Sequence, residues 1–156
     1  MRLAGLALLF LTCLLMGGEI IAGWKRRLRT VEALRTFVVA IGEQIACFGR
    51  PLEEIYGEYR DDCLVPAGFT RALGTLGWHG ALDLLPGLDE ESRRTAAAFG
   101  EALGRGGREQ ELARCRYTAG QLERIADALR ADLPGKTRLC RSLTVMTGAA
   151  AVIILL

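Results

Sequence analysis

The sequence predicts an all-α protein, an antiparallel helical bundle in the cytoplasm between N- and C-terminal transmembrane helices. Two uncharged, apolar segments lie at the ends of the chain. Apart from Arg2 and Glu19, every charged side chain lies between them, from Lys25 to Arg141. Two long stretches of this central region repeat apolar residues at heptad spacing, which is typical of paired helices. Strand-like alternation is absent and β-branched residues are sparse.

The N-terminal segment, residues 1–24, is interpreted as an uncleaved membrane anchor. A helix needs about 20 mostly apolar residues to cross the hydrocarbon core. Leu3–Trp24 supplies them, with Glu19 as its only charge. A signal peptide is the alternative, and it would need a small-residue cleavage site and a basic start. Residues 16–19 make a poor site of this kind, and the basic cluster follows the apolar run.

The C-terminal segment, residues 139–156, is predicted to be a second transmembrane helix. A straight helix of this length reaches roughly 27 Å, which is sufficient if Arg141 extends toward the headgroups. A buried terminal helix is the alternative. Basic residues flank the inner side of both apolar segments, at 25–29 and at 136–141. The positive-inside rule therefore places the body, residues 25–138, in the cytoplasm.

Two apolar seams are predicted on the first and last helices of the body. The first ends at Gly49 and consists of Val31, Leu34, Val38, Ile41, Ile45 and Phe48. The second consists of Leu112, Cys115, Ala119, Leu122, Ala126, Leu129 and Leu133. Both repeat at intervals of 3 and 4 residues, so we expect the two helices to pack antiparallel through these seams.

Three shorter helices are expected between the seams. The first, residues 51–62, begins with a proline at a tolerated position and turns inward Leu52, Ile55, Tyr56, Tyr59 and Cys63. The second, residues 66–76, turns inward Phe69, Leu73 and Leu76. The glycines and proline of residues 77–87 predict a loop that holds at most one helical turn. Asp89 is expected to cap the third helix, which buries Phe99 and Leu103 and ends at Gly104, Gly106 and Gly107.

The charged and reactive residues exclude several classes of function. The formal net charge is only +2, which argues against nucleic-acid binding. The five cysteines are scattered and are expected to be reduced thiols. His79 is the only histidine, too few for a zinc site or a histidine-assisted nucleophile. We therefore expect no enzymatic activity, no cofactor, no metal and no small-molecule substrate.

One short motif needs a separate interpretation. Gly135-Lys136-Thr137 looks like the end of a phosphate-binding loop, but the required earlier glycine is replaced by Arg130. We interpret Pro134-Gly135 as a break in the last helix.

The acidic residues of the 51–62 helix are the candidate docking site for a partner: Glu53, Glu54, Glu58, Asp61 and Asp62. Glu54, Glu58 and Asp61 recur at i, i+4 and i+7, so a continuous helix would present them as one stripe. A solvated surface is the plainer interpretation, and a surface that binds a basic partner is the functional one. A pair of catalytic carboxylates is the least favoured alternative.

In its order of elements the chain resembles the stage III sporulation protein AB family. The resemblance rests on Gly17-Gly18-Glu19, Leu28-Arg29, Leu34-Arg35, Ile41, Glu43, Ile45, Pro51-Leu52-Glu53, Leu103-Gly104, Gln110, Leu122-Glu123 and Arg141-Ser142-Leu143. It covers the whole chain, and it depends on the order of the elements rather than on one motif. Pro134-Gly135 is a departure, since similar proteins have a continuous charged helix there.

The resemblance implies a non-enzymatic membrane platform of the mother cell–forespore channel complex in endospore formation. Proteins of this family are similar to the cytoplasmic domain of the type II secretion platform protein F. Its implied partners are the membrane, the secretion-type ATPase called stage III sporulation protein AA, and other channel components. The implied location is the mother-cell membrane around the forespore. The alternative is a membrane-tethered regulator or receptor with a helical sensor domain, and ligand binding at the Trp78–His79 loop would support it.

Overall fold

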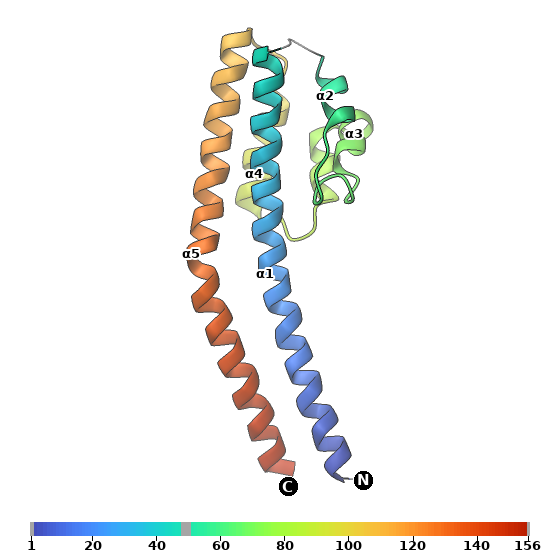
Figure 1. Ribbon diagram of the computed structural model, residues 1–156, viewed down its shortest axis with the longest axis vertical. Coiled ribbons are helices and arrows are strands. Elements are labelled where there is room, and N and C mark those ends of the chain that lie inside the picture. Colours follow the sequence, from blue (N-terminus) through green and yellow to red (C-terminus); the bar gives the residue numbers. More distant parts are fainter. Residues whose placement is uncertain (1, 48–50, 156) are drawn as a thin grey trace. The chain divides into compact units, whose positions relative to one another are not determined.

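The computed structural model describes the backbone of residues 2–47 and 51–155 (Figure 1). Within these ranges the side chains of residues 2–10, 13, 14 and 151–155 lie outside the described part. The helices in order are α1 (Arg2–Cys47), α2 (Leu52–Glu58), α3 (Phe69–Asp83), α4 (Glu90–Ala102) and α5 (Arg108–Leu155). No strand occurs in the described ranges, so the all-α prediction is confirmed.

The chain divides into two compact units. The terminal unit consists of Met1–Lys25 and Leu129–Leu156, and the body unit is Arg26–Ala128. Helices α1 and α5 contribute to both units, whereas α2, α3 and α4 belong to the body unit alone.

In the body unit α1 and α5 pack antiparallel, as the heptad seams predicted. The Nη2 of Arg35 lies 3.0 Å from the Oε1 of Glu123. A Cβ added to Gly42 would lie 3.1 Å from the Cβ of Cys115. Residue numbers thus rise along α1 as they fall along α5. The buried seam residues are Val31, Leu34, Val38, Ile41, Cys115, Ala119, Leu122 and Ala126. Phe48, the last residue predicted for the first seam, lies outside the described residues.

Six aromatic side chains form a cluster that joins α1 to the short helices: Phe37, Tyr56, Tyr59, Phe69, Trp78 and Phe99. Phe37 is fully buried, and its ring centroid lies 4.7 Å from that of Tyr59 and 5.6 Å from that of Phe69. Trp78 contacts Phe99 edge to face at 5.3 Å. Edge-to-face contacts are a favoured arrangement of aromatic rings, so this cluster fixes α2, α3 and α4 on α1.

Helix α3 differs from the prediction at both ends. It begins at Phe69, after Gly68 with φ 79°, rather than at residue 66. Residues 78–83 are helical, which is more than the single helical turn that was allowed in the predicted loop, and Gly77 separates the two helical parts with φ 69° and ψ −174°. Few residues other than glycine adopt this conformation. The kink places Trp78 in the aromatic cluster, while Leu76, predicted to point inward, is 64% exposed.

Helix α5 continues through Pro134, so the predicted break at Pro134-Gly135 is wrong. A proline inside a helix removes one hydrogen bond and costs about 3 kcal/mol. This cost is local, and α5 packs against α1 both before and after the proline. Cys115 lies against Gly42 in the body unit, and Thr144 lies against Gly17 in the terminal unit.

The terminal unit is a second antiparallel pairing of α1 and α5. A Cβ added to Gly17 would lie 2.6 Å from the Oγ1 of Thr144, so only glycine permits this approach. The Sγ of Cys140 lies 3.9 Å from the carbonyl oxygen of Gly17. Small residues at such crossings allow two helices to pack closely.

Among the described residues, no helix contains an apolar stretch of the length that a membrane span requires. The predicted spans, residues 1–24 and 139–156, include residues 1–10, 13, 14 and 151–156, whose side chains lie outside the described part. The two spans therefore remain predictions from the sequence.

Candidate functional site

The predicted acidic residues do not all lie on one helix. Glu53 and Glu54 are exposed in the first turn of α2, and Glu58 is its last residue. The helix then ends, because Tyr59 has an extended backbone with ψ 133°. The prediction of a helix to residue 62 is therefore wrong, and the continuous stripe is interrupted after Glu58.

Asp61 has a local structural role instead. Its Oδ1 accepts hydrogen bonds from the backbone N–H groups of Cys63 and Leu64, at 2.6 and 2.7 Å. Aspartate side chains commonly stabilise turns in this way. Asp62 beside it is exposed. The acidic surface of α2 thus consists of Glu53, Glu54 and Glu58, and we use this name for these three residues.

The side of α2 opposite the acidic surface packs against the core. Ile55 is only 4% exposed, and the ring of Tyr56 lies 5.9 Å from that of Phe37. Burial raises the pKa of Tyr56 above its ordinary value. Burial, with the nearby charge of Asp61, raises the pKa of Tyr59 to about 12. Both phenols are therefore neutral at physiological pH, and they add no charge to the acidic surface.

The Trp78–His79 segment is not an open loop. The Trp78 ring is engaged in the aromatic cluster, and a Cβ on Gly100 of α4 would collide with that ring. The exposed Nε2 of His79 lies 2.7 Å from the Oε1 of Glu101. These contacts join α3 to α4, and they occupy the two side chains at which ligand binding would support the receptor alternative.

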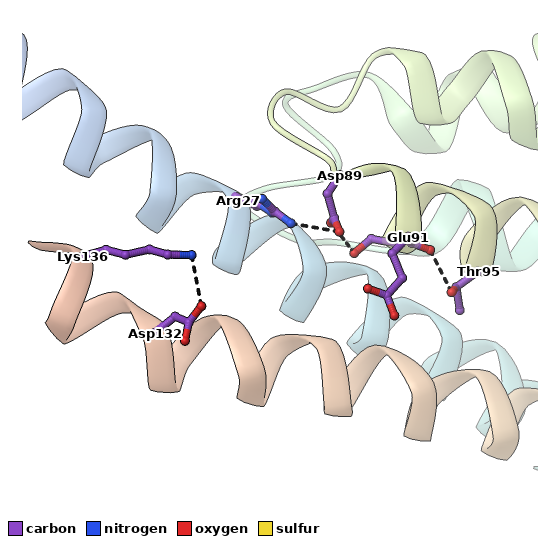
Figure 2. Close-up of polar contacts among 7 residues, drawn as sticks. Arg27, Asp89, Glu91, Thr95, Asp132 and Lys136 are labelled. Carbon is purple, nitrogen blue, oxygen red and sulfur yellow. Dashed lines mark hydrogen bonds and ion pairs between the residues drawn. The ribbon is translucent and has the colours of Figure 1, made fainter.

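Arg27 makes a contact that its membership of the basic cluster did not indicate. Its Nη2 lies 2.9 Å from the Oδ2 of Asp89 at the start of α4, as Figure 2 shows. The Oδ1 of Asp89 accepts a hydrogen bond of 2.6 Å from the buried Ser92. Asp89 occupies the predicted capping position, but its side chain makes no bond to the helix backbone. It ties α4 to α1 instead.

The glycine-rich turn between α4 and α5 is organised by an ion pair between the buried Glu111 and the half-buried Arg114. The Oε1 of Glu111 accepts from the backbone N–H of Gly106 at 2.8 Å and from Arg114 at 2.7 Å. Arg114 also donates to the carbonyl oxygen of Ala102, at the end of α4. Burial alone would raise the pKa of Glu111, but these hydrogen bonds hold it below its ordinary value. Gly106, one of the glycines predicted to end the helix, is thus held by a carboxylate.

The described residues contain no group of three or more His, Cys, Asp or Glu side chains that could hold a metal ion.

Gly135-Lys136-Thr137 lies inside α5, and Lys136 pairs with Asp132 at 3.0 Å (Figure 2). A phosphate-binding loop needs a turn before a helix rather than a helix interior. The motif therefore lies inside a continuous helix, and the break by which the sequence analysis explained it is not present.

Comparison with known proteins identifies the family. The fold and the exposed carboxylates place the chain among helical-bundle proteins. They do not by themselves indicate a reaction. Residues 2–156 match the family model described as stage III sporulation protein AB, and the chain belongs to this family. The family implies a role in sporulation. No curated protein matches the chain, and no solved structure does.

Proposed function

We propose that the chain is a non-enzymatic platform of the mother cell–forespore channel complex. In this role it couples a cytosolic secretion-type ATPase, stage III sporulation protein AA, to the membrane channel. Membership of the sporulation family supports the cellular process. The coupling role extends it through the resemblance of this family to the cytoplasmic domain of the type II secretion platform protein F.

Membrane attachment is part of the proposal. The body, residues 25–138, would lie in the cytoplasm, and residues 1–24 and 139–156 would lie in the mother-cell membrane around the forespore. The support is the charge pattern, because basic residues flank the inner side of both apolar segments. Cysteine residues added at the two termini should react with an impermeant maleimide from the non-cytoplasmic side only. Labelling from the cytoplasmic side would refute this topology.

The observation that carries the platform proposal is the acidic surface of α2. Three exposed carboxylates lie on a helix whose other side is fixed by Ile55 and by the contact between Tyr56 and Phe37. Such a surface changes little on binding, so little ordering entropy opposes an encounter with a partner. Charge complementarity would set the association rate and the register of a basic partner.

Charge reversal at this surface tests the proposal. Glu53→Lys with Glu54→Lys should weaken capture of the ATPase from sporulating cells roughly ten-fold and should lower spore yield, because it replaces attraction by repulsion. The helical circular-dichroism signal should stay close to that of the wild type.

The matched control is Glu90→Lys with Glu91→Lys. These two glutamates also lie in the first turn of a helix, so both double variants lose a similar interaction with the helix dipole. ATPase capture should be retained in the control. Equal capture by both variants would leave the acidic surface as solvated residues only and would remove the support for the platform role.

No observation favours the sensor or receptor alternative. Ligand binding at Trp78 and His79 would support that hypothesis, but their side chains contact the aromatic cluster and Glu101. A ligand there would have to displace these contacts.

A further inference from the structure

A hollow in the terminal unit is lined by three basic side chains. Lys25 comes from α1, and Arg138 and Arg141 come from α5. The hollow has a volume of about 510 Å³, and its remaining lining residues are Leu133, Pro134, Thr137 and Ser142. Two hydroxyl groups thus accompany the three cations, and the lining contains no carboxylate. This composition suits a phosphate group, which accepts several charge-assisted hydrogen bonds.

The three cations lack acidic partners within the described part of the chain, where no ion pair involves Lys25, Arg138 or Arg141. Lys136, in the same segment of α5, pairs with Asp132 at 3.0 Å. Like charges around one hollow repel each other. A bound anion would remove this repulsion, whereas Lys136 already has its counter-ion.

A second hollow continues from the first, since both share Lys25 and Arg141. It also has a volume of about 510 Å³, and its other lining residues are Gly17, Gly18, Ile21, Ala22, Thr144 and Val145. This lining is mostly apolar. Gly18 contributes open space, because a Cβ added there would meet nothing within 4 Å. A cationic hollow therefore leads into an apolar one along the same pair of helices.

We propose that these two hollows form a binding site for one anionic phospholipid. Lys25, Arg138 and Arg141 bind its phosphate, the hydroxyls of Thr137 and Ser142 donate to the phosphate oxygens, and one acyl chain occupies the apolar hollow. Basic pockets between helices at a membrane surface bind anionic headgroups by this chemistry. Free phosphate would fill only the first hollow and leave the second without a ligand. The inference rests on the membrane attachment within the proposed function.

The test uses the full-length chain purified in a neutral detergent, so that no bulk membrane charge contributes. Native mass spectrometry compares retention of phosphatidylglycerol with that of phosphatidylcholine at equal concentration. We expect preferential retention of one phosphatidylglycerol molecule. The double variant Arg138→Gln with Arg141→Gln should lose this preference by roughly ten-fold or more, since each cation near an anionic headgroup contributes about five-fold.

The control variant is Arg130→Gln with Lys136→Gln. It removes two charges from the same helix at positions that do not line the cationic hollow, and it should retain the lipid. Equal loss in both variants would overturn the site, and so would equal retention of the two lipids by the wild type. Displacement of phosphatidylglycerol by millimolar inorganic phosphate would assign the hollow to free phosphate and overturn the lipid proposal.

Failure here is distinguishable from failure of the proposed function. If the chain fractionates with membranes and captures the ATPase but shows no lipid preference, only the lipid site is refuted. If the chain does not fractionate with membranes, the platform proposal fails as well.

Discussion

Replacing Phe37 tests whether the aromatic cluster holds the body unit together. Phe37 is fully buried and its ring contacts those of Tyr56, Tyr59, Phe69 and Trp78. A buried Phe→Ala change costs about 3–5 kcal/mol through lost transfer energy and the cavity that remains. Ring–ring contacts contribute about 0.5–1.5 kcal/mol each beyond buried area, but contacts that share one ring are not additive. We therefore expect the upper half of that range.

Two further variants turn this expectation into a series. Phe37→Leu keeps an apolar side chain of similar bulk but loses the ring geometry, so it should cost about 1–1.5 kcal/mol. Val39→Ala alters a partly exposed residue of the same helix and should cost less than about 1 kcal/mol.

The assay is urea unfolding of the full-length chain in mild detergent, in a Trp24→Phe background. Trp78 is then the only tryptophan, and its fluorescence reports on the cluster itself. The shift in midpoint at constant slope gives the change in the free energy of unfolding. A loss below about 1 kcal/mol for Phe37→Ala, equal to that of Val39→Ala, would refute the view that the cluster fixes the short helices.

Two more predictions follow from close contacts in the body unit. Gly100→Ala should lower the melting temperature, because the added methyl group collides with Trp78, whereas Gly120→Ala, with nothing within 4 Å of its added Cβ, should stabilise by up to about 1 kcal/mol. Glu111→Gln should destabilise by about 1–3 kcal/mol at neutral pH, because it weakens the bond to Arg114. Since the folded-state pKa of Glu111 is lowered, its contribution is present above the ordinary glutamate pKa of about 4.3 and is lost as the pH falls through the folded-state value. In urea titrations, the wild type and the variant should therefore differ in stability at neutral pH and converge at acidic pH.

The long helices could be predicted because their packing repeats along the chain. The seams through Val31–Ile41 and Cys115–Ala126 recur at heptad spacing, and that spacing gives the faces on which α1 and α5 pack. It does not include Phe37, which is fully buried beside the seam. The short helices were harder, since single residues decide their ends. Asp61 supplies a turn through its carboxylate, and Gly77 supplies a kink through its positive φ. The spacing of apolar residues predicts neither this turn nor this kink.

The candidate site could be predicted only in part, again because single residues decide where the short helices end. Composition was sufficient to find the acidic residues, but only the backbone separates Glu53, Glu54 and Glu58 on the helix from Asp61 in the turn. The pairing of Arg27 with Asp89 joins residues far apart in sequence, so no local pattern contains it. The prediction at Pro134 was wrong for the opposite reason, because there a local signal was present but did not decide the structure. Its local preference for a break is overridden by the packing of α5 on α1.

Because α1 and α5 approach closely at Gly42, the reactivity of a buried cysteine can report on the separation of these two helices. Cys115 lies under Gly42, almost wholly buried, and burial, together with the charge of Glu111, raises its pKa to about 11. Its thiol is therefore protonated and shielded from alkylating reagents, whereas Cys47 is exposed. When the two helices separate, Cys115 becomes accessible and approaches ordinary reactivity. The rate at which N-ethylmaleimide modifies Cys115, relative to Cys47, thus measures how often the helix pair opens, without denaturant and without an engineered cysteine.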